Sequence, residues 1–131
     1  MEVKILKLSD LFRHETNCLN VPKGETLFKE GECGEEMYVL LSGTVDIFVN
    51  HKLVEKAGDG SILGEMGLVG DQPHSATVIA TSDCRLAAIG AARFNFLVQQ
   101  TPNFAIHVMR VMANRIRNID KLLEAKTAHK K

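Results

Sequence analysis

One loop of the sequence, residues 63–77 (LGEMGLVGDQPHSAT), combines a glycine-rich backbone with polar side chains. Its glycines, Gly64, Gly67 and Gly70, let the backbone approach a ligand with no Cβ in the way. A short helical turn that starts near Glu65 would direct free N–H groups at an anion. The loop therefore predicts a binding site for a small molecule that carries a phosphate or a similar anionic group.

Three side chains of this loop, Glu65, His74 and Ser75, could contact such a ligand. A carboxylate and a phosphate repel each other, so Glu65 fits best as an acceptor of hydrogen bonds from a sugar hydroxyl. Ser75 supplies a hydroxyl at the far end of the loop, and His74 could carry a positive charge. The alternative for each residue is structural: a solvated acid, a surface histidine and an exposed strand serine.

Short strands are expected on both sides of the loop. Apolar and polar residues alternate in brief runs from about residue 17 to residue 90, with turn signals at residues 22–24 (PKG), 42–43 (SG) and 58–60 (GDG). Asn50-His51 has the form of a hairpin tip. Many short strands with regular turns predict an all-β sandwich or barrel, with the glycine-rich loop between two of its strands.

Helical patterns occupy the two ends of the sequence. Apolar residues recur at near-helical spacing in residues 1–16, which predicts a short N-terminal helix or turn. After Gly90, three apolar residues share one helical face: Phe94, Leu97 and Val98. A long helix is then predicted from Phe104 to about Glu124.

The long helix has an apolar seam. The seam residues are spaced 3-4-3-4, as in a narrow coiled coil: Met109, Met112, Ile116, Ile119 and Leu123. This pattern predicts a homodimer that pairs through the C-terminal helix. We expect residues 1–131 to form a single domain, with the barrel at about 17–90 and the C-terminal helices at about 91–125.

Composition excludes several classes of protein. The 16 Lys and Arg balance the 16 Asp and Glu, which argues against a DNA-binding protein. Three cysteines without a CxxC pair, scattered histidines and the lack of a His-x-His pair predict no metal site and no cupin-type metalloenzyme. No segment approaches the roughly 18 apolar residues of a membrane span, and no secretory leader is evident. We expect a cytoplasmic protein that is not an enzyme and needs no cofactor.

The sequence resembles the cyclic-nucleotide-binding domain family, which includes catabolite-activator-type regulators and the regulatory subunit of cAMP-dependent protein kinase. The resemblance is carried by Gly24 in KGETLF, Gly31 in KEGE, Gly43 in YVLLSGTVDIFV, and the loop LGEMGLVGDQPHSATV, which is similar to the family's phosphate-binding cassette. It extends from about Val21 to Glu124. It implies a mainly β fold: a double-stranded β-helix (jelly-roll) barrel with a short N-terminal helix and C-terminal helices, the last one long.

The resemblance also implies a ligand, cAMP or cGMP, held by the first half of the loop. Gly64 and Met66, with their neighbours Leu63 and Gly67, would present backbone N–H groups to the cyclic phosphate. Glu65 would accept a hydrogen bond from the ribose 2′-OH. No residue of this set would have a catalytic role.

The second half of the loop and the long helix would complete the site. Ser75 and the Ala76 amide would close the far side of the phosphate, beside His74. The long helix would cover the base through one or more of three residues: Arg115, Ile119 and Asp120.

One position departs from the family pattern, because His74 stands where the phosphate-binding arginine is expected. Arginine is always charged and binds phosphate with two parallel hydrogen bonds. Histidine offers a single hydrogen bond and is mostly neutral when the pH is above its reference pKa of about 6.5. The loss would weaken binding by about one to two orders of magnitude. Protonation and binding would be linked if His74 met the phosphate, so affinity would then rise as the pH falls.

Two functions remain after this departure. The first is a regulatory sensor, in which a bound cyclic nucleotide shifts the C-terminal helix. The second is a degenerate domain that dimerises or binds proteins without nucleotide. A transcription factor is disfavoured, because the sequence stops before the helix-turn-helix that the family's regulators carry after the long helix.

Overall fold

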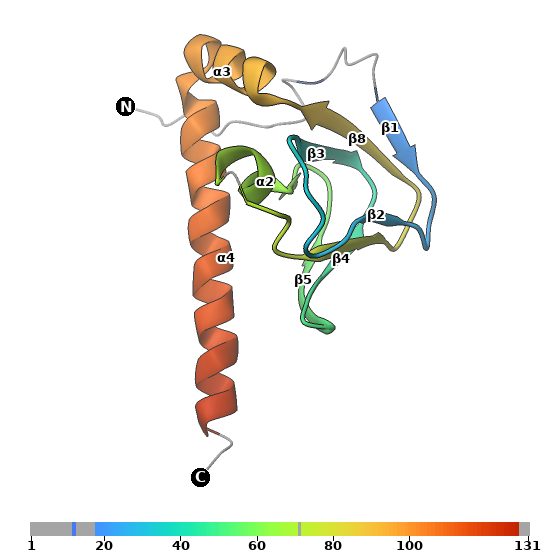
Figure 1. The fold of residues 1–131 in the computed structure, drawn as a ribbon, viewed down its shortest axis with the longest axis vertical. Helices are drawn as coiled ribbons and strands as arrows, with labels where there is room; N and C mark the ends of the chain where they lie inside the picture. The colour runs from blue at the N-terminus through green and yellow to red at the C-terminus, as the bar shows by residue number, and fades with distance from the viewer. Residues whose placement is uncertain (1–11, 13–17, 71, 129–131) are drawn as a thin grey trace.

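The structure, a computed structural model, describes residues 12, 18–70 and 72–128, with side chains as far as residue 122. In these residues, eight strands form two four-stranded antiparallel sheets, and one short helix and two C-terminal helices accompany them. The strands form a barrel beside the long helix α4 (Figure 1). The sequence predicted many short strands in a sandwich or barrel, and the structure confirms such strands in two sheets.

The first sheet has the strand order β1-β8-β3-β6. Its strands are β1 (Cys18–Val21), β8 (Cys84–Ile89), β3 (Met37–Ser42) and β6 (Ile62–Leu63). The central pair, β3 and β8, is apolar on both faces, which is why each reads as an almost continuous hydrophobic run rather than a strict alternation.

The second sheet has the strand order β2-β7-β4-β5. Its strands are β2 (Thr26–Phe28), β7 (Thr77–Ala80), β4 (Val45–Val49) and β5 (Lys52–Ala57). Asn50 and His51 join β4 to β5 with φ angles of 51° and 64°, as a two-residue hairpin turn requires. The hairpin tip expected at these two residues is confirmed.

Two apolar cores result from this arrangement. The inner core lies within the barrel, where Leu40 of β3 and Leu86 of β8 pack against Ile47 and Val78 of the second sheet. The outer core lies on the other face of β3 and β8, where Val39 and Ile89 pack with residues of the C-terminal helices. Alternate residues of one strand thus serve both cores.

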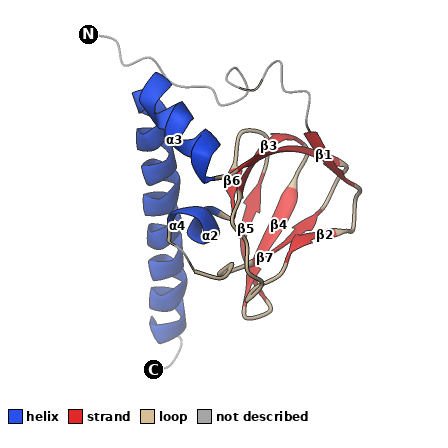
Figure 2. Ribbon diagram, turned by 45° about the horizontal axis from the view of Figure 1, so that its top comes forward, coloured by secondary structure: helices blue, strands red, loops and turns tan. Residues whose placement is uncertain are grey.

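The two C-terminal helices cover the outer core (Figure 2). They are α3 (Ala91–Gln100) and α4 (Pro102–Ala128). Phe104 of α4 is 0% exposed and meets the Phe94 ring of α3 edge to face, with centroids 5.7 Å apart. The predicted apolar face of α3 packs on this core, and α4 begins two residues before the predicted start because proline suits the first helical position.

The short helix α2 (Glu65–Val69) follows β6. Gly64 precedes it with φ 74°, a left-handed conformation that glycine adopts without strain. The predicted helical turn near Glu65 is confirmed. The predicted N-terminal helix lies outside the described residues, except for Phe12, which is buried in the outer core. Among the described helices, none combines the length and the apolar character needed to cross a membrane.

Candidate ligand-binding site

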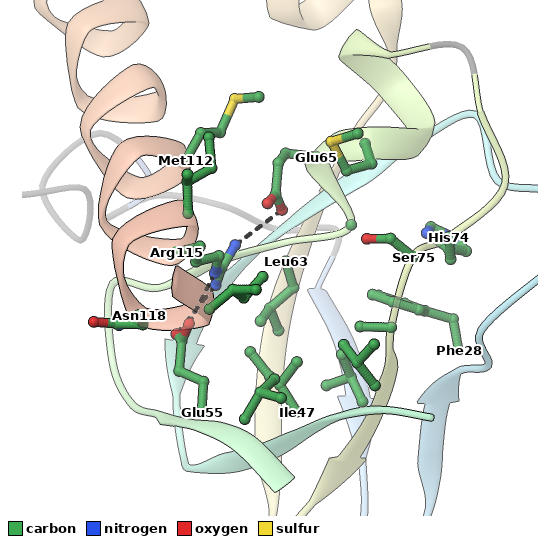
Figure 3. Close-up of a pocket in the computed structure, with 18 residues that line it drawn as sticks. Phe28, Ile47, Glu55, Leu63, Glu65, His74, Ser75, Met112, Arg115 and Asn118 are labelled. Atoms are coloured by element: carbon green, nitrogen blue, oxygen red, sulfur yellow. Dashed lines mark hydrogen bonds and ion pairs between the residues drawn. The ribbon is translucent and has the colours of Figure 1, made fainter. Parts of the chain in front are cut away.

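A cavity of about 400 Å³ lies between the barrel, the glycine-rich loop and α4 (Figure 3). This volume falls within the range of small-molecule pockets, roughly 300–1,000 Å³. The barrel contributes mostly aliphatic side chains, such as Ile47 and Val78, and α4 contributes Met112 and Ile116. The glycine-rich loop therefore forms one wall of an open cavity, and the side chains of the loop do not fill this cavity.

Most of the residues that the sequence singled out line this cavity. Those from the loop are Leu63, Gly64, Glu65, Met66, His74, Ser75 and Ala76, and those from α4 are Arg115 and Ile119. Gly67 and Asp120 are not part of the lining. A Cβ on Gly67 would lie 2.6 Å from the Gly34 carbonyl oxygen, so this glycine allows α2 to approach the loop at Gly34. The contacts of these residues with a ligand remain a prediction.

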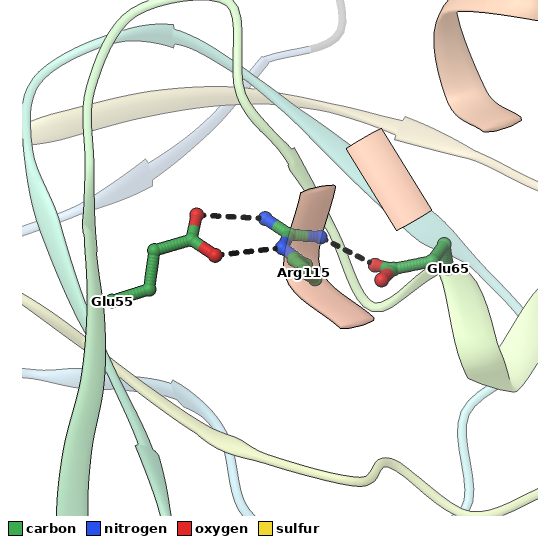
Figure 4. Close-up of polar contacts among 3 residues, drawn as sticks. All are labelled: Glu55, Glu65 and Arg115. Carbon is green, nitrogen blue, oxygen red and sulfur yellow. Dashed lines mark hydrogen bonds and ion pairs between the residues drawn. The ribbon is translucent and has the colours of Figure 1, made fainter. Parts of the chain in front are cut away.

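Arg115 of α4 connects the helix to two sides of the cavity, to Glu55 of β5 and to Glu65 of the glycine-rich loop (Figure 4). Its Nη1 donates to Glu65 Oε2 at 2.9 Å, and its Nε and Nη2 donate to the two oxygens of Glu55 at 3.1 and 3.4 Å. The side chains of Arg115, Glu65 and Glu55 are only 17%, 10% and 25% exposed. Burial alone would lower the pKa of Arg115, but the two carboxylates outweigh burial and raise it, so the guanidinium stays charged.

Sequence reasoning missed Glu55. The register of β4 and β5 shifts between Ile47, opposite Glu55, and Phe48, opposite Leu53, so that Val54 has no partner. An extra residue of this kind changes the alternation of side chains along a strand. As a result Val54 and Glu55, although adjacent, both line the cavity. No residue type in this segment signals such a bulge.

His74, in the second half of the glycine-rich loop, is buried and only 5% exposed. Its ring stacks on Phe28, with centroids 3.9 Å apart and an interplanar angle of 18°. A Cβ on Gly34 would overlap its Nε2, and Cβ atoms on Gly64 and Gly67 would lie 3.1 and 3.3 Å from its Cε1. Three glycines thus form a slot that fits this ring.

Burial in the slot favours the neutral form of His74. Burial lowers the pKa of His74, and the nearby carboxylates of Glu32 and Glu65 offset this effect only in part. Its Nδ1 is buried and has no hydrogen-bond partner among the described residues. Its backbone is fixed by two hydrogen bonds, from Gly31 N to His74 O at 2.8 Å and from His74 N to Glu32 O at 2.9 Å. The positive charge considered for His74 from the sequence is therefore disfavoured near neutral pH.

The burial of His74 should make stability depend on pH. Its folded-state pKa lies below the unfolded value of about 6.5, so the unfolded chain binds a proton first as the pH falls. We expect the free energy of unfolding to decrease as the pH falls through about 6.5 toward the folded-state pKa. Urea unfolding at a series of pH values from about 7.5 to 5.5 should show this slope, and His74→Phe should reduce it.

His107 provides the necessary control, because burial followed by the nearby Arg110 lowers its pKa as well. The variant His107→Gln removes its contribution and leaves that of His74. Equal pH slopes for the parent protein and His74→Phe would contradict the assignment of a neutral, buried His74.

The residues of the apolar seam of α4 differ in what they contact. Met112 is half-buried in the outer core, and Met112, Ile116 and Ile119 line the cavity. Met109 and Ile116 are 61% and 60% exposed, and the side chain of Leu123 lies outside the described ones. Pairing of two chains through this seam therefore remains a prediction, since cavity lining explains part of the pattern.

The fold and the cavity together define a β-barrel with a cavity between one loop and the last helix. The family model for the cyclic nucleotide-binding domain matches residues 18–101. The chain belongs to the cyclic nucleotide-binding domain family. Within the described residues, no group of three His, Cys, Asp or Glu could hold a metal ion.

Individual relatives agree with this assignment. The cyclic AMP receptor protein of Thermus thermophilus is 29% identical over 108 residues, which cover 79% of this chain and 50% of the relative. The cAMP-dependent protein kinase regulatory subunit of Eremothecium gossypii is 35% identical over 74 residues, or 56% of this chain and 16% of the relative. The chain thus spans half or less of the length of these relatives.

A solved structure supports the predicted jelly-roll fold. The crystal structure of Thermus thermophilus catabolite activator protein matches with a TM-score of 0.77 and 25% identity, over 95% of this chain and 61% of that chain. The similarity includes most of the chain. The predicted mainly β jelly-roll with a long last helix is confirmed.

Proposed function

We propose that the domain is a regulatory sensor that binds a cyclic nucleotide, cAMP or cGMP, and couples its occupancy to the position of α4. The observation that carries the proposal is the cavity between the glycine-rich loop and α4, across which Arg115 and Glu65 pair at 2.9 Å. A ligand that reaches Glu65 necessarily meets the helix at the same place. The names of the relatives, a cyclic AMP receptor protein and a cAMP-dependent kinase subunit, support this class of ligand.

The loop would hold the sugar and the phosphate. Within the described residues, the side chain of Glu65 is bonded to Arg115 through Oε2, so Oε1 can accept a hydrogen bond from a ribose 2′-OH. The N–H groups of Glu65 and Met66 lie in the first turn of α2, where no intrahelical acceptor exists. These N–H groups, with the Ser75 hydroxyl and the Ala76 amide, would face the phosphate.

The helix would report on the ligand. The base would lie against Met112, Ile116 and Ile119, which α4 presents to the cavity. A ligand shifts a conformational equilibrium only as far as it binds one state better than the other. The state with α4 closed on the base would therefore gain population, with Arg115 still held by Glu55.

In this role the domain binds and does not catalyse, and it needs no metal or cofactor. We take residues 1–131 as one domain that acts in the cytoplasm, without contacts to DNA or membranes. A homodimer through α4 belongs to the same proposal. Its support is the exposed apolar side chains along the helix, such as Ile106 and Met109.

A second function is favoured by one specific observation, the neutral and buried His74 at the position of the expected arginine. A domain that has lost its phosphate contact could act as a dimerisation or protein-interaction module without nucleotide. In that case the cavity would be vestigial, and the exposed face of α4 would carry the function.

Calorimetry with cAMP and cGMP separates the two functions. For the sensor we expect saturable binding, with a Kd in the micromolar range or weaker. Glu65→Gln should weaken it by about tenfold, because the neutral amide accepts a weaker hydrogen bond from the ribose. Glu35→Gln, at an exposed loop position outside the cavity lining, is the matched control. An absence of binding up to millimolar ligand would favour the interaction module.

A further inference from the structure

The cavity has no free positive charge to offer an anion. Its described lining contains two carboxylates, Glu55 and Glu65, and one guanidinium, Arg115. Arg115 is paired with both carboxylates, at 3.1 and 2.9 Å. The formal charge of this group is −1, and no lysine or second arginine stands among the described lining residues. An anionic ligand would therefore meet a weakly repulsive site.

His74 does not supply the missing cation, for a geometric reason. Its ring lies flat against Phe28, beyond Ser75 in Figure 3, and the backbones of Gly34, Gly64 and Gly67 surround it. The charged imidazolium carries a proton on both ring nitrogens, so it would place an N–H at Nδ1, which is buried and has no hydrogen-bond partner among the described residues. Such a charge is costly away from water.

The rest of the cavity suits the other parts of a nucleotide. Aliphatic side chains such as Ile47, Val54 and Leu63 form most of the wall, and Met112 and Ile119 face them from α4. A base and the face of a sugar bury apolar area against such a wall. A phosphodiester that enters the same space loses its hydration, and only backbone N–H groups and one hydroxyl replace it.

We propose that the cavity recognises the nucleoside part of its ligand and gains little from the phosphate, so that uncharged purine nucleosides are ligands of the same site. The inference rests on the proposed function, because it concerns the ligand class of that cavity. An arginine contact would make the cyclic nucleotide bind about ten to a hundred times more tightly than its nucleoside. Here we expect the two dissociation constants to agree within about threefold.

The experiment compares four ligands on the unmodified chain by calorimetry: cAMP with adenosine, and cGMP with guanosine. Binding of a nucleoside within about threefold of its cyclic nucleotide supports the inference. A cyclic nucleotide that binds at least about tenfold more tightly than its nucleoside overturns the inference and leaves the proposed function intact. Binding of the nucleoside alone supports the inference and overturns cyclic-nucleotide sensing. Absence of binding by all four ligands overturns both.

A positive charge introduced at position 74 tests why the cyclic nucleotide and its nucleoside are expected to have similar dissociation constants. His74→Arg should strengthen binding of the cyclic nucleotide by about tenfold or more and leave the nucleoside unchanged. His51→Arg places the same charge at the exposed hairpin tip, outside the cavity lining, and should not change the ratio. If His74→Arg strengthened both ligands equally, the inference would be overturned. An arginine fits the glycine slot poorly, so the variant could fail to fold. In that case the four-ligand comparison on the unmodified chain decides the inference.

Discussion

Arg115→Met is expected to destabilise the folded domain by about 3 kcal/mol, because it leaves Glu55 and Glu65 facing each other without their shared cation. Removal of one partner from a buried ion pair commonly costs about 3–5 kcal/mol. We take the lower end of this range because the Glu55 side chain is 25% exposed and therefore partly hydrated. Urea unfolding at pH 7 measures the change, read from the midpoint at constant slope.

Two further variants isolate the electrostatic part of this effect. Arg117→Met makes the same substitution at an exposed position of α4 and should cost less than about 0.5 kcal/mol. Arg115→Met combined with Glu65→Gln should recover part of the lost stability, since one of the two unpaired charges is removed. Similar losses of unfolding free energy for Arg115→Met and Arg117→Met would show that the ion pairs of Arg115 with Glu55 and Glu65 do not stabilise the fold.

Phe104→Ala is expected to destabilise the domain by about 4 kcal/mol, because it creates a cavity in the outer core. Phe104 is fully buried, packs edge to face on Phe94, and joins Met37 and Ile89 in the core that connects α4 to the barrel. The change also loosens the first turns of α4, so hydrogen exchange in this helix should become faster. Thermal and urea unfolding report the loss of stability.

Phe96→Ala is the matched control for this prediction. Phe96 lies on α3 and is 61% exposed, so its replacement should change stability by less than about 0.5 kcal/mol. If the two phenylalanine variants lost equal stability, α4 would not be held to the barrel through the outer core.

Local sequence patterns were sufficient for most of the barrel. Alternation in the segment of β4, and turn signals such as Asn50-His51, depend only on neighbouring residues, and the structure confirms them. The helical turn near Glu65 was also predicted from the loop sequence, and the structure confirms it, with Gly64 directly before the turn in a left-handed conformation. Features of this kind are encoded within a few residues of one another.

The missing parts of the site depend on contacts between distant segments. The slot of His74 is built by Gly34, forty residues earlier in the chain, and its backbone is fixed by the loop at Gly31 and Glu32. Glu55 enters the cavity through a register shift that no local pattern announces. The partners of Arg115 are separated from it by 60 and 50 residues. Sequence reasoning could propose Arg115 for the site, but it could not find its carboxylates.

The apolar seam of α4 shows a different limit. A stripe of apolar residues predicts that one face of a helix packs against another surface. It does not identify that surface, which could be a second chain, the barrel or a ligand. Met112 is half-buried and lines the cavity, whereas Ile116 lines the same cavity and is still 60% exposed. Spacing along one helix therefore does not distinguish a dimer from a ligand pocket.

The placement of Arg115 near the middle of the 27-residue α4 has a mechanical consequence. The backbone of α4 continues past Arg115 to Ala128, along the lower half of the helix in Figure 1, for about 20 Å at 1.5 Å per residue. A helix that tilted about Arg115, where the guanidinium is held by two carboxylates, would move like a lever with its fulcrum at this residue. A tilt of roughly 10° at the fulcrum would carry the far end through about 3.5 Å, so a small rearrangement beside Glu65 becomes a displacement the size of an atom.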